Sequence, residues 1–293
     1  MAAPAQEPKL EIGRFAIDAN LTLRRMVVRH PAPQRTVLLL HGFPETLMVW
    51  KDIALALAED CEVHAFDWPG FGESSRPAAD RFAYAPRDYA RVLKQYIDRA
   101  GIDRSTLVIY ATDIGALPAL LLAQDEPAIA RSLVVGDFAP FNRPAFMWEN
   151  LQALKAEPAA SKVRAFMNAN RAEILANTFF RGLPAEAHYQ IPGDVRDDMA
   201  RGWSRDGMTA VDAFSRYYAQ FSRDQDHFEA NLARLTTPVT VIWGAEDLYI
   251  KKDMAIEFAD RIKAERTLLP GIGHYVHLQA PSLAIAAIRA AFR

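Results

Sequence analysis

Residues 107–116, LVIYATDIGA, contain the turn on which the fold prediction rests. A short apolar run, typical of a buried strand, leads through a tight turn into an apolar segment with helical character. Small residues flank Asp113, with Ala111 two positions before it and Gly115 and Ala116 two and three positions after it. This is the steric pattern of the G-x-S-x-G elbow, which strains the backbone of its central residue, with aspartate in place of serine.

An aspartate at the start of a helix is often only an N-cap, because its carboxylate accepts hydrogen bonds from free backbone amides. Two other segments favour a reactive site instead. Residues 41–45, HGFPE, follow a buried strand upstream, and residues 270–274, PGIGH, follow the last apolar run. The carboxyl ends of parallel strands meet at one edge of a sheet, so we expect an anion-stabilising loop and a base, His274, beside Asp113.

Eight short runs predict strands. Two of them carry interspersed polar residues and are expected to pair antiparallel: 10–17 and 21–29. The others are continuous apolar runs, typical of strands covered on both faces: 36–40, 63–66, 107–110, 133–135, 239–243 and 267–269. Helical stretches alternate with them: 86–100, 114–124, 254–263 and 281–292. The alternation predicts an α/β fold with a mostly parallel, doubly wound sheet and right-handed crossovers.

The alternation breaks between residues 139 and 228. No buried-strand run occurs there, and apolar residues recur at spacings of three and four, as in Val163, Phe166 and Met167. We therefore predict a helical cap over 139–228, inserted into a core that 1–138 and 229–293 form.

Composition limits the class of partner. Charged residues make up 24% of the chain and the formal net charge is -2, so no basic field attracts nucleic acid or a membrane surface. Apolar runs are too short to span a bilayer, and residues 1–8 lack the pattern of a signal peptide. We predict a cytoplasmic protein that acts on a small molecule, and the sequence leaves a homodimer open. The single cysteine, Cys61, is expected to be a buried thiol.

In their order and spacing, these motifs resemble those of the α/β-hydrolase superfamily, and within it the epoxide hydrolase and dehalogenase branch. HGFPE at 41–45 resembles the HGxP motif of that branch, DWPGFGES at 67–74 its D-x-x-G-x-G-x-S turn, and 111–116 its G-x-D-x-G elbow. The resemblance covers nearly the whole chain outside the cap. It departs at Thr112, where epoxide hydrolases commonly carry histidine. It implies an α/β-hydrolase fold with Asp113 as the nucleophile and no cofactor.

His274 lies in a glycine-rich loop and is predicted to be the general base, which needs a carboxylate to fix its tautomer. Asp247 ends the segment 243–247, WGAED, which resembles the usual acid loop of the family. Asp137 follows the sixth strand, a position that haloalkane dehalogenases and some epoxide hydrolases use. We favour Asp247 and keep Asp137 as the alternative. His277 is expected to begin or pack beneath the final helix, and the other histidines show no metal-ligand spacing.

An aspartate nucleophile limits the chemistry. A carboxylate acylates poorly, but it can displace a leaving group from an sp³ carbon and form an alkyl ester. His274 would then activate water to attack the carbonyl of Asp113, and the backbone N–H groups of Phe43 and Ile114 would stabilise the oxyanion. Epoxides and carbon–halogen bonds are the two substrate classes that suit this route.

The two classes differ in what stabilises the leaving group. Haloalkane dehalogenases place tryptophan directly after the nucleophile, and fluoroacetate dehalogenases place arginine there; Ile114 is neither. Resembling epoxide hydrolases use cap tyrosines, or a histidine and a tyrosine, and FSRYYA at 214–219 resembles the late-cap helix that bears one. Tyr218 is the first candidate and Tyr217 the second. The stretch 161–170 contains neither tyrosine nor histidine for the other donor.

Aromatic residues of the cap are expected to line an apolar pocket: Trp148, Trp203, Phe179 and Phe180. The sequence thus predicts an epoxide hydrolase that forms a vicinal diol through an ester on Asp113. One alternative is a hydrolytic dehalogenase of a haloalkane or haloacid with the same nucleophile. The other is a catalytically idle, ligand-binding α/β-hydrolase.

Overall fold

A computed structural model describes residues 9–31 and 33–293. The prediction about a signal peptide concerns residues 1–8, which lie outside the described residues. Eight strands form one sheet in the order β1-β2-β4-β3-β5-β6-β9-β10. The strands are β1 (Leu10–Ala16), β2 (Thr22–Val28), β3 (Thr36–Leu40), β4 (Glu62–Phe66), β5 (Leu107–Thr112), β6 (Ser132–Gly136), β9 (Val239–Gly244) and β10 (Glu265–Leu269).

The pairing pattern confirms the predicted fold class. β2 pairs antiparallel with both β1 and β4, and every pair from β4 to β10 is parallel. All eight predicted runs form strands, and every residue of β3, β5 and β6 is buried. The run 267–269 differs from its prediction as a strand covered on both faces, since Thr267 is exposed and only Leu269 is buried. The reason is that β10 lies at the edge of the sheet, where it has a single neighbour.

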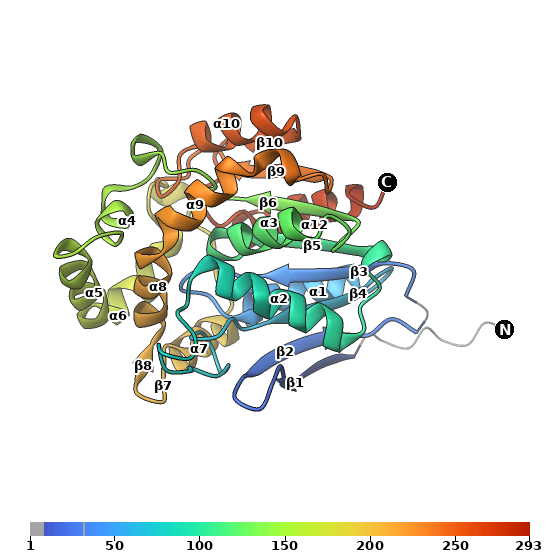
Figure 1. The fold of residues 1–293 in the computed structure, drawn as a ribbon, viewed down its shortest axis with the longest axis horizontal. Helices are drawn as coiled ribbons and strands as arrows, with labels where there is room; N and C mark the ends of the chain where they lie inside the picture. The colour runs from blue at the N-terminus through green and yellow to red at the C-terminus, as the bar shows by residue number, and fades with distance from the viewer. Residues whose placement is uncertain (1–8, 32) are drawn as a thin grey trace.

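Helices cover both faces of the sheet. α2 and α3 pack together on one face, while α1 and α12 pack together on the other (Figure 1). The core helices are α1 (Lys51–Leu57), α2 (Pro86–Ala100), α3 (Ala116–Asp125), α10 (Lys252–Ile262), α11 (Val276–Gln279) and α12 (Pro281–Ala290). Short 3₁₀ helices connect elements: η1 (Leu47–Trp50), η2 (Arg104–Thr106), η3 (Asp113–Gly115), η4 (Pro144–Phe146), η5 (Thr178–Phe180), η6 (Ala185–Ala187) and η7 (Leu232–Arg234).

The ends of α2 are fixed by capping residues that can be recognised in the sequence. Pro86 occupies the first turn, where its missing N–H costs nothing, and the Asp88 carboxylate accepts a hydrogen bond from the Ala85 amide. Gly101 ends the helix in the left-handed conformation, with a φ of 66°. The predicted and observed bounds of this helix agree because local residues alone fix them.

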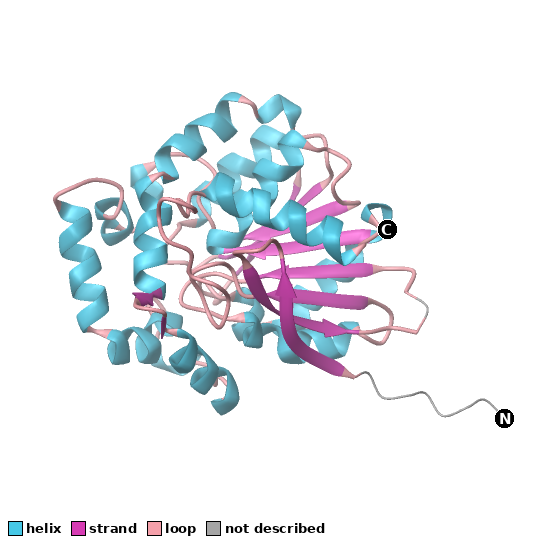
Figure 2. Cartoon of the chain, turned by 60° about the horizontal axis from the view of Figure 1, so that its bottom comes forward, coloured by secondary structure: helices cyan, strands magenta, loops and turns pink. Residues whose placement is uncertain are grey.

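The stretch 139–228 contributes no strand to the eight-stranded sheet. Most of its helices gather beyond one end of the sheet (Figures 1 and 2), whereas the last of them packs against α2 and α3. They are α4 (Glu149–Ala153), α5 (Ala159–Ala169), α6 (Arg171–Asn177), α7 (Gly193–Gly202), α8 (Ala210–Ala219) and α9 (Phe221–Ala230), with the hairpin β7 (Ser204–Arg205) and β8 (Met208–Thr209) between α7 and α8. We refer to these elements as the cap.

Cys61 is fully buried in the core, and burial raises the pKa of its thiol to about 12. A thiol with this pKa stays protonated at neutral pH. Within the part of the chain that the structure describes, no helix has both the length and the apolar character needed to cross a membrane.

The end of β6 leaves no room for a side chain. A Cβ at Gly136 would lie 1.9 Å from the carbonyl oxygen of Ile242 in β9. We expect Gly136→Ala to force the strands apart and lower the free energy of unfolding by about 3 kcal/mol, the upper range for overpacking. The control is Gly13→Ala, because nothing lies within 4 Å of that position. Urea unfolding compares the two variants, and equal stabilities would contradict the prediction.

Candidate active site

Asp113 sits at the turn between β5 and η3. Its φ of 49° lies in the left-handed region, which an L-residue other than glycine rarely adopts. The turn lies directly against the end of β3: a Cβ at Gly115 would be 3.1 Å from both the His41 carbonyl oxygen and the Leu40 Cβ. A larger residue at Gly115 would therefore displace the turn. The elbow exists because its neighbours are small, as the sequence pattern indicates.

The loop after β3 supplies a backbone donor to the Asp113 carboxylate. The Phe43 N–H donates to Asp113 Oδ1 over 2.8 Å. Ile114 directly follows Asp113 in the first turn of η3, so its amide lies at the start of that helix. The two backbone groups that the sequence suggests as an oxyanion hole thus belong to segments that meet at Asp113.

His274 lies between two carboxylates. Its Nδ1 is 2.8 Å from Asp247 Oδ2, and its Nε2 is 3.4 Å from Asp113 Oδ2. The other oxygen of Asp247 accepts hydrogen bonds from the backbone N–H groups of Tyr249 and Ile250. This turn fixes the Asp247 carboxylate, which in turn fixes the orientation of the imidazole ring.

Asp137 is completely buried close to the same histidine, but it makes a different contact. Its Oδ1 accepts a hydrogen bond from the Gly244 N–H over 3.0 Å, and its Oδ2 has no partner among the described residues. The structure therefore brings Asp247, and not Asp137, to His274 Nδ1. Burial and the neighbouring Asp247 charge raise the pKa of Asp137 well above its usual range, which favours the protonated acid.

The charge of His274 depends on both carboxylates. Burial lowers the pKa of the imidazole, but Asp247 and Asp113 outweigh this effect and raise the pKa well above its ordinary value. The two carboxylates therefore favour the protonated imidazolium. Loss of the charge on Asp113 would remove part of this stabilisation.

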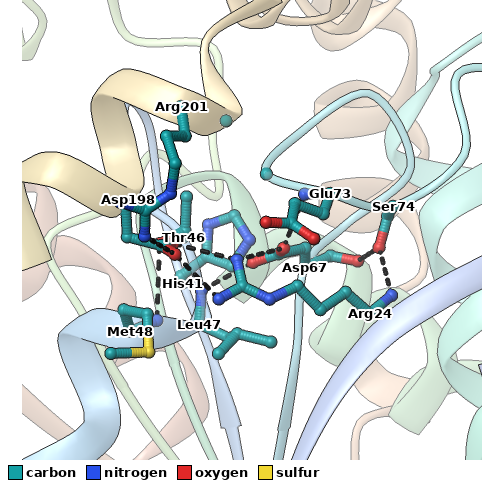
Figure 3. Close-up of polar contacts among 12 residues, drawn as sticks. Arg24, His41, Thr46, Leu47, Met48, Asp67, Glu73, Ser74, Asp198 and Arg201 are labelled. Atoms are coloured by element: carbon teal, nitrogen blue, oxygen red, sulfur yellow. Dashed lines mark hydrogen bonds and ion pairs between the residues drawn. The ribbon is translucent and has the colours of Figure 1, made fainter. Parts of the chain in front are cut away.

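A buried polar network holds the loop after β3 from the side of the sheet (Figure 3). Asp67, the first residue of the DWPGFGES segment, accepts hydrogen bonds from the Leu47 and Glu73 amides at 2.7 and 2.9 Å. The Ser74 hydroxyl donates to the Asp67 carbonyl oxygen and accepts from the Arg24 amide. The DWPGFGES segment, which forms the turn after β4, is thus a structural brace that links β2 to η1.

The cap joins the same network through Asp198 of α7. Its carboxylate accepts a bidentate pair of hydrogen bonds from Arg24 at 2.8 and 2.9 Å, and another from the Thr46 hydroxyl at 2.6 Å. Figure 3 shows these side chains converging beside His41. Although burial opposes ionisation, the hydrogen bonds from Arg24 and Thr46 hold the pKa of Asp198 below its usual range. This part of the cap is therefore firmly tied to the core.

A largely apolar cavity of about 370 Å³ opens above Asp113 and His274. Trp148 lines it, as the sequence predicts, and so do residues that the sequence analysis missed: Leu151, Val163, Met167, Phe214, Tyr249 and Tyr275. Tyr249 and Tyr275 lie within two residues of Asp247 and His274 in the sequence. That proximity is the signal that could have identified them.

The other predicted pocket aromatics pack elsewhere. Trp203 lies beside Phe43, and Phe179 lies against Tyr275, so both support the lining without forming it. Phe180 stacks on His188. Their long apolar side chains are used for packing within the cap, which is the more common role of aromatic residues.

Tyr217 and Tyr218 line a second, small cavity that also contains Asp113 and Ile114. The Tyr217 hydroxyl is buried without a hydrogen-bond partner among the described residues, and none is recorded there for the Tyr218 hydroxyl. Burial, together with the charges of Asp113 and Asp247, raises the pKa of Tyr218 well above its usual value. Tyr218 is therefore a neutral phenol that lines the same small cavity as Asp113.

The side of the cavity formed by α5 carries no acid. Val163, Phe166 and Met167 of this helix line the large cavity. At the wall formed by α6 and η5, Arg181 pairs with Glu173 at 2.5 Å and lies over the Trp148 ring. Glu173 thus neutralises Arg181, whereas Lys162 of α5 also lines the cavity and forms no ion pair with the other residues that the structure describes.

The charge arrangement predicts a measurable shift at His274. We expect Asp113→Asn to lower the pKa of His274 by about one pH unit or more, because removing an adjacent anion destabilises the imidazolium. An NMR titration of the His274 ring measures the pKa in both proteins. Asp253→Asn, a change of an exposed carboxylate on α10, is the control. An unchanged pKa in Asp113→Asn would contradict the assigned electrostatic contact.

Known proteins share the fold. Residues 35–281 match the family described as alpha/beta hydrolase fold. Haloalkane dehalogenase 2 of Mycobacterium tuberculosis is 27% identical over 268 residues, which cover 86% of this chain and 86% of the relative. This relationship supports the resemblance to the epoxide hydrolase and dehalogenase branch.

Two solved structures share nearly the entire architecture. Cfl2 of Burkholderia cenocepacia has a TM-score of 0.80 at 21% identity, covering 97% of this chain and 96% of its own. The epoxide hydrolase CorEH has a TM-score of 0.75 at 20% identity, covering 97% of this chain and 100% of its own. At this level of identity, the two similarities establish a common fold.

Proposed function

The chain is a hydrolase that belongs to the α/β-hydrolase fold family, and we propose that it is an epoxide hydrolase with Asp113 as its nucleophile. The observation that carries the proposal is the neutral Tyr218 hydroxyl, buried in the small cavity beside Asp113 and without a recorded partner among the described residues. An epoxide oxygen needs such a proton donor when its ring opens.

In the first half-reaction, the Asp113 carboxylate attacks a ring carbon of the epoxide. Oδ1 is held by the Phe43 amide, so Oδ2 is the attacking oxygen. A bond forms between Oδ2 and carbon as the carbon–oxygen bond of the ring breaks. The Tyr218 hydroxyl gives its proton to the departing alkoxide, which leaves a hydroxyalkyl ester on Asp113.

In the second half-reaction, the ester no longer carries the charge of Asp113. The pKa of His274 falls, and the imidazolium releases its proton to become a base, still oriented by Asp247. His274 then removes a proton from water, and the hydroxide attacks the carbonyl carbon of Asp113. The amides of Phe43 and Ile114 stabilise the oxyanion on Oδ1 until the diol leaves. The bond between the Asp113 carbonyl carbon and Oδ2 then breaks, and the departing oxygen takes the second proton of the attacking water. The proton that the imidazolium released restores the Tyr218 hydroxyl, and the proton that His274 took from water restores the imidazolium.

A hydrolytic dehalogenase is the second candidate, and the similarity to a haloalkane dehalogenase favours it. Its leaving halide would need N–H or O–H donors. Ile114 supplies none from its side chain, whereas the hydroxyls of Tyr217 and Tyr218 lie in the small cavity. A haloacid would also need a cation for its carboxylate; the residues that line the small cavity include none, and of the cations Lys162 and Arg181 that line the large cavity, Arg181 is paired with Glu173. The tyrosine hydroxyls in the small cavity therefore suit the opening of an epoxide better than the departure of a halide.

The first test traps the ester in His274→Gln. This variant can form the ester, but it lacks the base that hydrolyses it. Aryl epoxides, alkyl epoxides, haloalkanes and haloacids are supplied separately, and intact protein mass is recorded. We expect a mass increase equal to a whole epoxide, located on Asp113 by peptide mapping and absent from His274→Gln/Asp113→Asn.

Other results would change the assignment. A mass increase equal to the substrate without its halogen would establish a dehalogenase. No adduct from any compound in the panel, while the variant remains folded, would contradict an Asp113 ester and leave an idle, ligand-binding protein.

The second test separates the two tyrosines. We expect Tyr218→Phe to slow ester formation from an epoxide by about 10²-fold, the lower range for loss of a general acid. Tyr217→Phe is the matched control, because it removes the adjacent buried hydroxyl. Stopped-time mass measurements of the ester give both rates. A larger loss in Tyr217→Phe would transfer the role of proton donor to Tyr217.

A further inference from the structure

We propose that Glu45 and His277 are positioning residues for the oxyanion hole, and that they govern hydrolysis of the Asp113 ester without governing its formation. This inference rests on the proposed function, since it concerns the second half-reaction. It gives a role to His277, whose only predicted role was to begin or pack beneath the final helix.

Glu45 and His277 form a buried pair remote from solvent. The Glu45 Oε1 lies 2.6 Å from His277 Nε2, and both side chains are 0% exposed. The other oxygen of Glu45 accepts a hydrogen bond from the Gly42 N–H over 2.8 Å. Glu45 therefore connects α11 to the Gly42 amide. The next residue, Phe43, carries the amide that faces Asp113.

The Gly42 peptide sets the direction of the next amide. Phe43 N–H donates to Asp113 Oδ1, and a Cβ at Gly42 would lie only 2.6 Å from the Asp113 Cβ. With the chain this close to Asp113, a rotation at Gly42 would turn the Phe43 N–H away from Oδ1. The Glu45 carboxylate opposes that rotation by holding the Gly42 N–H.

One short segment holds both the base and the loop. His274 faces Asp113, Tyr275 donates its hydroxyl proton to the Phe43 carbonyl oxygen at 2.9 Å, and His277 pairs with Glu45. Contacts from Tyr275 and His277 thus reach the two ends of the loop segment that contains Gly42 and Phe43. Residues 274–277 therefore hold both the general base, His274, and the loop that carries the oxyanion donor, the Phe43 N–H.

A merely structural role would not require ionisable groups here. Burying a carboxylate and an imidazole carries a desolvation cost, and apolar replacements of a buried pair are often neutral or stabilising. His277 also packs against Trp50, with 4.4 Å between the ring centroids and the rings tilted by 36°, and its Nδ1 lacks a partner among the described residues. The hydrogen bond to the Gly42 amide is the function that an apolar pair could not replace.

The two half-reactions differ in whether they need the oxyanion hole, which separates a positioning role from a general effect on stability. Ester formation is a displacement at carbon, in which Asp113 loses charge and no carbonyl oxyanion develops. Ester hydrolysis develops a full oxyanion on Oδ1, which requires the Phe43 N–H in its correct place. A displaced donor should therefore slow the second step selectively.

The test compares an apolar double variant with a conservative one. Glu45→Leu/His277→Leu removes the acceptor of the Gly42 N–H while leaving no unpaired buried charge. Glu45→Gln keeps an oxygen for that amide and a group that can bond His277. Each protein is mixed with the substrate that labels His274→Gln most fully, and the formation and decay of the ester are followed by quenched-flow mass measurements.

We expect ester decay to slow by about 10²-fold in the double variant, as for loss of one oxyanion donor, while ester formation keeps its wild-type rate. In steady state, kcat and KM should then fall together, with kcat/KM retained. Glu45→Gln should hydrolyse the ester at nearly the wild-type rate. Circular dichroism and thermal unfolding establish that the compared proteins are folded.

The outcomes distinguish this inference from the proposed function. If His274→Gln forms no ester, both are overturned. If the ester forms but decays normally in the double variant, or if both steps slow equally, the positioning role alone is overturned. If the double variant does not fold, Glu45→Ala provides the same comparison, and an unchanged ratio of the two rates in it would also overturn the role.

Discussion

The strained turn at Asp113 is the constraint on which the rest of the site depends. A φ of 49° costs an aspartate on the order of 1 to 3 kcal/mol, so the surrounding structure must hold it there. Gly115 allows the turn to approach the end of β3, and Gly42 allows the loop after β3 to approach Asp113 in return. This mutual close approach brings the Phe43 amide to the carboxylate. The loops after β3 and β10 can then both reach the Asp113 side chain.

The charges of the side chains around His274 determine what chemistry this site can perform. Two carboxylates flank His274 and favour its imidazolium form, whereas burial and the Asp247 charge raise the pKa of Asp137 and favour its neutral form. An ester on Asp113 would neutralise one of these carboxylates and so release the histidine for base chemistry. The same side chain can thus carry a positive charge in one half of a cycle and act as a base in the other. Asp247 orients the ring throughout.

The cap contributes in two different ways. Through α5, α6 and α8 it supplies apolar walls above Asp113, together with a tyrosine pair in the small adjoining cavity. Through α7 it supplies Asp198, whose contacts with Arg24 and Thr46 join the cap to the brace around Asp67. The cap, which forms the cavity walls, and the loop after β3, which carries the Phe43 amide, are consequently tied to the same hydrogen-bond network. Such sharing suits a site in which a tyrosine of the cap and an amide of the core must act on one substrate.

The sequence by itself determined the strand runs, the helix α2, the elbow and the two loops that meet it, because each depends on local sterics, periodicity or turn-forming residues. It did not determine which aspartate contacts His274, since Asp137 and Asp247 both follow strands of the same sheet edge. The direction of each side chain decides that contact, and only packing sets it. Likewise, Glu45 and His277, which form a buried hydrogen bond, are separated by 232 positions. Contacts of this kind carry no local signal, so the tertiary structure alone decided them.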